Sequence, residues 1–368
     1  MQELIDRLRG ALAEAGLERA VLSHPETLAG LCLFDPSPEE WPVANPFVAS
    51  PALLVLGPDG ATLLVASFFA LHASRSPVRV VQYRSYDYER APDPAAELAQ
   101  ALGELVGGAG PIGIEASSLP VAVADVLRAA GGVLVAVDEL VVTARRIKLP
   151  VELDAIRKAS HLSDIAQAAV KELAQPGMRE VEVAALAQAA MAREAGRRVP
   201  SILTVTTGEA TSTGGWEATD RIIAPGDLVL CDAGPWIDGH WSDSANAVVA
   251  GTPSGEQRRI FDRVRRALEL GIELCKPGAL ACEIDAAVRA ELADLGPTYG
   301  HHTGHAIGAS WSEPPRITPY EQIRLEEGMV LAVEPAFYAT DFGGIRLEHV
   351  FVVRPGGNAI LTRFEHTL

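Results

Sequence analysis

The sequence predicts two domains of different class, an α/β domain over residues 1–142 and an α+β domain over residues 143–368. Three observations predict this organisation. The chain has 368 residues, which is more than one hydrophobic core usually holds. Helix and strand patterns alternate singly through the first part. In the second part, pairs of helices alternate with pairs of antiparallel strands, twice over, as expected for two related halves around one sheet.

The first domain opens with an amphipathic helix, LIDRLRGALAEAG, which ends at Gly16. Three strands are expected after it in RAVLSH, VRVVQYRSY and VLVAV, and GPIGIEASS is expected to form a strand and a turn. ASPALLVLGPDGATLLVASFF should form a hairpin that turns at Pro58-Asp59-Gly60. AAELAQALGELVGG and ADVLRAAGG are expected to be helices. No glycine-rich phosphate loop follows any of these strands, so a nucleotide-binding function has no support.

The character of the chain changes in the segment ELVVTARRIKLPVELDAIRKAS. This segment passes from an apolar strand through a basic patch to Pro150, which can open a helix. We therefore place the domain boundary between residues 142 and 143. The second domain should contain helices over 151–174, 180–196, 256–275 and 282–294. Its strands are expected near 201–206, 228–233, 240–250, 329–334 and 345–353.

Composition limits the classes of partner and the compartment that we expect for this protein. Apolar residues make up 48% of the chain, and the net charge is −17, from 48 acids and 31 bases. Nucleic acid is an unsuitable partner because phosphate binding needs basic patches. The four cysteines form no CxxC pair, so we expect reduced thiols and a cytoplasmic protein. The charged first helix does not resemble a signal peptide, and no apolar run is long enough for a membrane.

Four acids lie at the ends of apolar segments in the last third of the chain. The acids occur in LVLCD232AG, HWSD243SANAVV, MVLAVE334P and GIRLE348HVFVV. A histidine, His305, also lies at the end of an apolar segment, in HHTGH305AIGA. Buried carboxylates are unfavourable unless they are paired or bound to metal. Four that converge would repel by roughly 3 kcal/mol per pair at ~5 Å and an effective dielectric of ~20. A pair of divalent metal ions is the simplest way to hold them.

Hairpin geometry predicts that the two aspartates meet. Asp238-Gly239 is a strong two-residue turn signal, so Ile237 should oppose His240 and Gly234 should oppose Asp243. Because strand side chains alternate with period two, Asp232 then shares a face with Asp243 as a diagonal neighbour. A bulge would break this parity. The expected diagonal backbone separation is about 7–8 Å, which lets both carboxylates reach ions at about 2.0–2.2 Å.

A second hairpin should present the two glutamates. Glu334 and Glu348 would lie opposite each other in a hairpin centred on Asp341. His305 has small neighbours that would allow close backbone approach, and its imidazole would be a fifth ligand. A single acid at a strand end is usually a solvated edge or a turn cap. Four acids and a histidine, paired by two hairpins, favour a metal site.

These elements resemble a known family. LCDAG…HWSD, GHAIG, VEPAFY and GIRLEH look like the metal-binding signature of the pita-bread metallopeptidases, which include methionine aminopeptidase, Xaa-Pro aminopeptidase, prolidase and creatinase. The first domain, together with RRIKLPVELDAIRKAS, resembles the two-domain creatinase/prolidase branch. The resemblance implies a creatinase-like N-terminal domain and a pita-bread catalytic domain. It also implies a metallohydrolase that attacks an amide bond with a metal-bridging hydroxide, in the manner of an Xaa-Pro dipeptidase or aminopeptidase.

The resemblance also implies roles for individual residues. Asp232 would chelate one ion, Asp243 and Glu348 would bridge both, and His305 and Glu334 would complete the shell of the other ion. Glu334 would also transfer the proton of the attacking water. His301 matches a substrate-facing histidine, and Arg346 matches an arginine that supports the site. The expected cofactors are two divalent ions, with Mn²⁺, Co²⁺ or Zn²⁺ as candidates. His302 has no counterpart in the signature.

Two departures from the family pattern bear on the substrate. A histidine expected before the first aspartate is missing where this chain has Gly215 and Trp216. A second one, expected seven residues after His305, is replaced by Ser312, although Glu313 remains. Trp216 and Trp311 could line an apolar pocket or simply pack in the core.

Three readings of the function therefore stay open. The first is a hydrolase of a small peptide or amide, the second a same-fold hydrolase of a non-peptide C–N substrate, and the third a protein of this fold with weak or no peptidase activity. A homodimer is expected by analogy with two-domain relatives.

Overall fold

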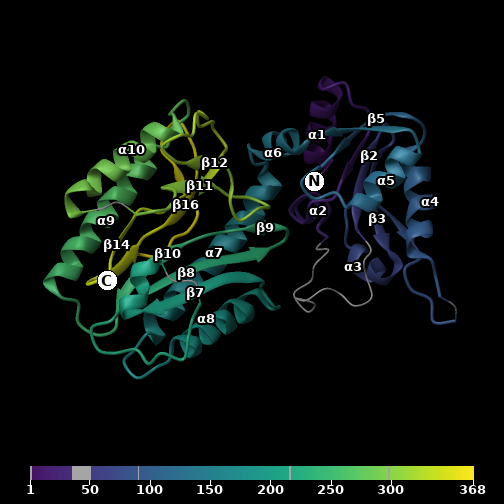
Figure 1. Ribbon diagram of the computed structural model, residues 1–368. Coiled ribbons are helices and arrows are strands. Elements are labelled where there is room, and N and C mark those ends of the chain that lie inside the picture. Colours follow the sequence, from purple (N-terminus) through teal and green to yellow (C-terminus); the bar gives the residue numbers. More distant parts are fainter. Residues whose placement is uncertain (1, 35–50, 90, 215–216, 297–298) are drawn as a thin grey trace. The chain divides into compact units, whose positions relative to one another are not determined.

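The computed structural model describes residues 2–34, 51–89, 91–214, 217–296 and 299–368. Contacts divide the chain into two compact units, Met1–Arg146 and Ile147–Leu368 (Figure 1). The predicted boundary between 142 and 143 falls inside the helix that ends the first unit, α6 (Asp138–Arg145). Among the described residues, no helix is long and apolar enough to cross a membrane.

The first unit is an α/β domain with one described sheet. Its strands lie in the order β4-β3-β2-β1-β5-β6, and β1–β2 and β2–β3 are antiparallel while the other pairs are parallel. The expected hairpin is confirmed, because Gly57 pairs with Gly60 across the turn. The strands are β1 Ala20–Leu22, β2 Leu53–Gly57, β3 Gly60–Ala66, β4 Arg79–Tyr83, β5 Gly110–Ile114 and β6 Gly132–Ala136. The helices are α1 Gln2–Glu14, α2 Pro25–Cys32, α3 Ala70–Ala73, α4 Pro94–Val106, α5 Val121–Ala129 and α6.

Helices α2, α3 and α6 of this unit were not predicted. The expected apolar strand in ELVVT is wrong, since these residues lie in α6. A short apolar run fits a buried strand or a helix equally well, and here the acids of the first turn, Asp138 and Glu139, favour the helix dipole. Helix α2 begins with Pro25 at its first turn and depends on a distant residue, Glu115. The Glu115 carboxylate accepts hydrogen bonds from the backbone nitrogens of Ser23 and His24 at 2.8 and 2.7 Å.

In the second unit, both helix pairs form as predicted. Figure 1 shows one pair beside β7 and β8 and the other beside β14 and β16. Capping explains why one of the four helices starts where it does: the Ser254 hydroxyl accepts a hydrogen bond from the Gln257 backbone, and the Gln257 side chain accepts one in return. The helices are α7 Pro150–Leu173, α8 Glu180–Ala195, α9 Gly255–Leu274 and α10 Ala281–Leu292.

The strands of the second unit form three hydrogen-bonded sheets rather than the one expected. The orders are β10-β8-β7 with β9 on β8, then β12-β11-β13-β16-β17, and finally β14-β15. The predicted strands 240–250 and 345–353 are each interrupted, at Ser242–Ser244 and at Leu347–Glu348, where candidate ligands lie. The strands are β7 Ser201–Thr207, β8 Leu228–Ile237, β9 His240–Trp241, β10 Ala245–Val249, β11 Gly304–Ala306, β12 Glu313–Ile317, β13 Val330–Val333, β14 Ala336–Ala339, β15 Gly343–Arg346, β16 His349–Val352 and β17 Ala359–Ile360.

Strand β8 is buried on both faces. Val229 and Cys231 pack in a core with side chains of α7 and α8, including Leu162. Leu228 and Leu230 pack in a second core with side chains of α9, including Phe261. Because strand residues alternate between faces, one strand supplies side chains to both of these cores.

The close approach expected around His305 is confirmed at Gly304. A Cβ atom at this position would overlap the carbonyl oxygen of Ala332 on the neighbouring strand, which is backbone and has little room to move. We expect Gly304→Ala to lower the free energy of unfolding by about 2 kcal/mol or more, as overpacked cores do. The matched control is Gly255→Ala, where no atom lies within 4 Å of the added carbon. Urea unfolding of both variants checks this, and equal stabilities would contradict it.

Candidate metal centre and active site

The first hairpin brings Asp232 and Asp243 together as predicted. Asp238 and Gly239 both have positive φ, 49° and 80°, which a two-residue hairpin turn of this kind requires. Ile237 pairs with His240, and Asp232 pairs with Ala245 farther along, so the register is unchanged across the interruption. The side-chain parity therefore survives, and the two carboxylates are close enough to perturb each other's pKa.

Polar side chains on one face of α7 hold this interruption in place. Ser160, Ser163 and Gln167 are buried at helical spacing. The Ser160 hydroxyl lies 3.0 Å from that of Ser242, and the Gln167 amide nitrogen donates to the Ser244 carbonyl at 2.9 Å. These contacts fix the backbone on both sides of Asp243 without using the carboxylate. Sequence reasoning missed them, although three polar residues on a helix face that is otherwise apolar are a signal.

The second hairpin places Glu334 and Glu348 opposite each other. Val333 pairs with His349 on one side of them and Ala336 pairs with Arg346 on the other, so the register centred on Asp341 is confirmed. Neither glutamate belongs to the ladder itself. The Glu348 backbone nitrogen instead donates to the Ala245 carbonyl at 2.9 Å, which joins the second hairpin to the first.

His305 is on β11, and its side chain lies between Asp243 of the first hairpin and Glu334 of the second. Its Nε2 atom is 3.6 Å from Asp243 Oδ2 and 3.7 Å from Glu334 Oε1. Its Nδ1 atom is 3.0 Å from the Ala306 carbonyl, an acceptor that assigns the proton to Nδ1. Nε2 is then unprotonated and available as a metal ligand, the arrangement in which a carbonyl orients a ligating histidine.

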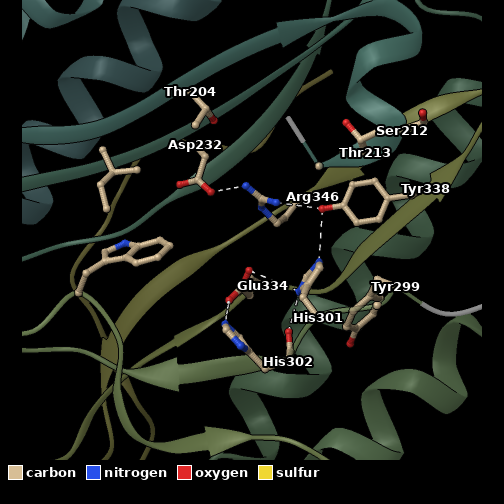
Figure 2. A pocket seen from close by; sticks show the side chains of 14 residues that line it. Thr204, Ser212, Thr213, Asp232, Tyr299, His301, His302, Glu334, Tyr338 and Arg346 are labelled. Atoms are coloured by element: carbon tan, nitrogen blue, oxygen red, sulfur yellow. Dashed lines mark hydrogen bonds and ion pairs between the residues drawn. The ribbon is translucent and has the colours of Figure 1, made fainter. Parts of the chain in front are cut away.

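Two groups of side chains have ligand atoms close enough to share an ion. One contains Asp243, His305 and Glu348, and the other contains His302, His305 and Glu334, with all ligand atoms of a group within 4.8 Å of one another. These two groups contain four of the five predicted ligands, and His305 belongs to both groups. Asp232, the fifth, adjoins Asp243 and is paired with the guanidinium of Arg346 (Figure 2).

Four carboxylate oxygens of this cluster have no hydrogen-bond donor in the described part of the chain. Among the residues that the structure describes, no hydrogen-bond partner reaches Oδ1 of Asp232, Oδ1 of Asp243 or either carboxylate oxygen of Glu348. Burial raises the pKa of Asp243 to about 7 and holds the pKa values of Asp232 and Glu348 well above their ordinary range, although Arg346 opposes the shift of Asp232. Buried, unpartnered carboxylate oxygens around an imidazole are a donor set that fits divalent cations.

The pKa of Glu334 is lowered, unlike the pKa values of the other acids of the cluster. Burial alone would raise its pKa, but the hydrogen bond with His302, the largest of the opposing effects, brings it down to about 2. His302 Nε2 lies 2.8 Å from Glu334 Oε1, and His301 Nδ1 lies 3.7 Å from Glu334 Oε2 (Figure 2). Glu334 is therefore an ionised carboxylate, able to accept a proton or to bind a cation.

A chain of hydrogen bonds leads from Arg346 to His301. Arg346 Nη1 donates to the Tyr338 hydroxyl at 3.0 Å, and that hydroxyl lies 3.3 Å from His301 Nε2 (Figure 2). Burial is the main cause that lowers the pKa of His301, so its imidazole is neutral at pH 7. Sequence reasoning identified Arg346 and His301 but missed Tyr338. Its position, four residues after Glu334 along the same strand direction, is the signal that could have found it.

These residues surround a cavity of about 470 Å³. A volume of this size suits a small ligand. Trp311 does line the cavity, whereas Gly215 and Trp216 lie outside the described residues. The lining residues are Ile202, Thr204, Ser212, Thr213, Gly214, Asp232, Tyr299, Gly300, His301, His302, Trp311, Glu334, Tyr338 and Arg346.

The segment after Trp311 explains why Glu313 remains although the expected histidine is replaced. The Ser312 hydroxyl accepts a hydrogen bond from Arg316 at 3.3 Å. Glu313 forms a buried ion pair with Lys148 at 2.6 Å and accepts a hydrogen bond from the Ser310 backbone nitrogen at 3.1 Å. Glu313 thus stabilises the fold of this loop through its contacts with Lys148 and Ser310.

We expect Lys148→Met to lower the free energy of unfolding by about 3–5 kcal/mol, because it leaves the buried Glu313 carboxylate without this cation. The double variant Lys148→Met/Glu313→Leu removes both charges and should recover much of that loss. Urea unfolding of the single and double variants measures the coupling. A single variant as stable as the wild type would contradict a buried, interacting pair.

Comparison with known proteins gives a consistent result. The profile of metallopeptidase family M24 matches residues 154–355, and that of the creatinase/prolidase N-terminal domain matches residues 5–147. An Xaa-Pro dipeptidase of Pyrococcus horikoshii is 32% identical over 262 residues, which cover 70% of this chain and 74% of that protein. An Xaa-Pro dipeptidase of Pyrococcus furiosus is 33% identical over 237 residues, or 63% of this chain and 67% of that one.

Solved structures resemble the whole chain. The prolidase from Pyrococcus horikoshii OT3 has a TM-score of 0.84 at 25% identity and covers 100% of this chain and 99% of its own. The dipeptidase PepE from Mycobacterium ulcerans has a TM-score of 0.80 at 26% identity, with coverages of 100% and 96%. The chain therefore belongs to metallopeptidase family M24, in the two-domain branch with a creatinase/prolidase N-terminal domain, and it is an enzyme of the metallopeptidase class.

Proposed function

We propose that this protein is a dinuclear metal-dependent dipeptidase of the Xaa-Pro type. The observation that carries the proposal is a set of four buried carboxylate oxygens, on Asp232, Asp243 and Glu348, for which the described residues supply no hydrogen-bond donor. The named activity of the curated relatives, Xaa-Pro dipeptidase, supports the substrate class. Asp232, Asp243, His305, Glu334 and Glu348 would hold two divalent ions.

When bound, the two ions would polarise the scissile carbonyl and lower the pKa of water at the site. The chain's own residues would handle the protons. The ionised Glu334 carboxylate would accept a proton as the water oxygen bonds to the carbonyl carbon. It would then return that proton to the amine nitrogen as the C–N bond breaks. A carboxylate that ionises readily is suited to the first of these steps.

The cavity would orient the substrate. Tyr338 and His301 supply hydrogen-bonding groups on its wall, and Arg346 holds Tyr338 in place through the hydrogen bond at 3.0 Å. Trp311 and Ile202 supply apolar surface. A short peptide with a compact apolar side chain, such as Ala-Pro, fits these features and the cavity volume.

A second candidate is hydrolysis of a non-peptide C–N bond in a small molecule. The observation in its favour is Ser312, which occupies the position of an expected substrate-facing histidine and bonds to Arg316. Loss of one such donor to a developing oxyanion costs about 2.7–4 kcal/mol of transition-state stabilisation. A substrate without a peptide carbonyl at that position would not need the donor.

The test is hydrolysis by the full-length protein after chelation and reloading with Mn²⁺, Co²⁺ or Zn²⁺. We expect turnover of Ala-Pro, and of other dipeptides more slowly, only after reloading. Glu334→Gln should lose about 10²–10⁴-fold in kcat, as expected for a general acid–base residue. Robust Ala-Pro turnover would exclude the second candidate. Binding of two ions without turnover of any dipeptide would overturn the first.

We also propose a cytoplasmic homodimer. All four cysteines are unpaired, which fits a reducing compartment. Homodimers are the commonest oligomers of soluble proteins. Size-exclusion chromatography with light scattering should give twice the chain mass of 38.9 kDa. A mass of one chain at micromolar concentration would overturn the dimer and leave the catalytic proposal intact.

A further inference from the structure

His302 is the one histidine of the cavity wall that the family signature leaves without a role. It lies two residues before β11, and its side chain is 30% exposed. Its Nε2 atom is 2.8 Å from Glu334 Oε1, the shortest imidazole–carboxylate contact among the described residues of the cluster (Figure 2). The imidazole therefore points at a candidate metal ligand rather than into solvent.

The backbone holds His302 in this position. Arg289 Nη2 donates to the His301 carbonyl at 2.7 Å, and the Thr303 backbone nitrogen donates to the Ile317 carbonyl at 2.8 Å. The Glu334 backbone nitrogen donates to the Thr303 carbonyl at 2.9 Å. The loop that carries His302 is thus bonded directly to the residue that its side chain contacts. Such support is what a preorganised ligand needs.

The distances match those between ligands on one ion. Two ligands at about 2.1 Å from a metal are about 3.0 Å apart in octahedral and about 3.4 Å apart in tetrahedral geometry. Glu334 Oε1 is 2.8 Å from His302 Nε2 and 3.7 Å from His305 Nε2, which bracket these values. The rings of His302 and His305 are nearly perpendicular, at 83° with centroids 5.2 Å apart. Two imidazoles and one carboxylate oxygen can therefore converge on a single position.

We propose that His302 is a sixth metal ligand, which binds the same ion as His305 and Glu334. This inference rests on the proposed dinuclear site and adds to it a residue outside the five-ligand signature. One ion would be held by oxygen ligands, and the other by two imidazoles and carboxylates. Imidazole ligands favour Zn²⁺ and Co²⁺, whereas oxygen-rich sites suit Mn²⁺. His302 would therefore make one of the two metal positions prefer Zn²⁺ or Co²⁺ over Mn²⁺.

The experiment uses metal-free full-length protein titrated with Zn²⁺ and with Mn²⁺ by isothermal titration calorimetry. X-ray absorption at the zinc edge then counts imidazoles with both positions filled. We expect the wild type to average one imidazole per zinc and His302→Asn to average one half. The variant should also bind one equivalent of Zn²⁺ roughly tenfold or more weakly, as loss of a metal-site residue does, with a smaller change for Mn²⁺.

The matched control is His301→Asn, which removes the neighbouring imidazole and should leave the zinc-edge spectrum unchanged. His302→Ala is a second variant in case the asparagine variant misfolds, and circular dichroism verifies the fold of each. A wild type that binds two ions but averages one half imidazole per zinc would overturn the role of His302 alone. A wild type that binds no metal would overturn the proposed function, and the sixth ligand with it.

Discussion

Glu348→Gln is expected to lower peptide hydrolysis by about 10³-fold or more, while the metal-free variant unfolds no more easily than the metal-free wild type. Neither carboxylate oxygen of Glu348 has a hydrogen-bond partner among the described residues, and burial raises its pKa well above the ordinary range. A neutral amide of the same size removes that unfavourable charge. It also removes a proposed anionic metal ligand, and loss of about 4 kcal/mol of transition-state stabilisation corresponds to 10³-fold in rate.

A second buried glutamate provides the control. Glu180 accepts hydrogen bonds from the backbone nitrogens of Thr207 and Thr219, at 2.7 and 3.0 Å, and from both hydroxyls, at 2.7 and 2.6 Å. Glu180→Gln should therefore destabilise the fold and leave metal binding unchanged. Metal content by atomic emission, kcat and urea unfolding are measured on both variants. If Glu348→Gln destabilised the metal-free protein more than Glu180→Gln, the donor-free description of Glu348 would be wrong.

Chelation is expected to abolish hydrolysis and to lower the melting temperature, and both should return on reloading. Saturation to 100 times the dissociation constant stabilises a protein by about 2.7 kcal/mol per ion. For a unit of this size, each kcal/mol shifts Tm by about 2–4 °C, so a loss of roughly 5–10 °C per ion is expected. Differential scanning calorimetry before and after dialysis against EDTA checks this. An unchanged Tm would contradict a site that binds metal in the folded state.

The apparent metal affinity should rise with pH. In the metal-free protein burial raises the pKa of Asp243 to about 7 and those of Asp232 and Glu348 above their usual range. At pH 6 the Asp243 carboxyl holds a proton that a cation must displace, and at pH 8 this carboxyl is ionised. Each proton displaced makes the affinity fall by about tenfold per pH unit below the pKa. Calorimetric titrations at pH 6, 7 and 8 in two buffers measure both the affinity and the proton release.

Local patterns predicted the geometry of the acids well. The turn Asp238-Gly239 sets the register of the first hairpin, and a symmetric hairpin around Asp341 sets that of the second. Both depend on residues near each other in sequence, so side-chain parity can be counted directly. The interruptions at Asp243 and Glu348 did not shift that parity, because backbone hydrogen bonds such as Ala233 N to Ser244 O, at 2.8 Å, preserve the register.

The contacts that sequence reasoning missed depend on pairings between distant segments. His302 reaches Glu334 only because β11 pairs with β13, and that pairing has no turn signal between its strands. The expected strand in ELVVT failed for a different reason. A short apolar run gives no period long enough to separate strand from helix, and one contact at the start of α6, between Asp138 and the backbone nitrogens of Ala116 and Ser117, is nonlocal.

The two-sided burial of β8 makes the second unit cooperative. If α7 and α8 separated from the strand, Val229 and Cys231 would be exposed, and the ladder that holds Leu228 and Leu230 against α9 would lose its support. Neither half can then unfold while the other persists, despite the internal two-fold organisation. The candidate metal ligands on β8 and on the second hairpin are therefore formed or lost together, in a single denaturation transition.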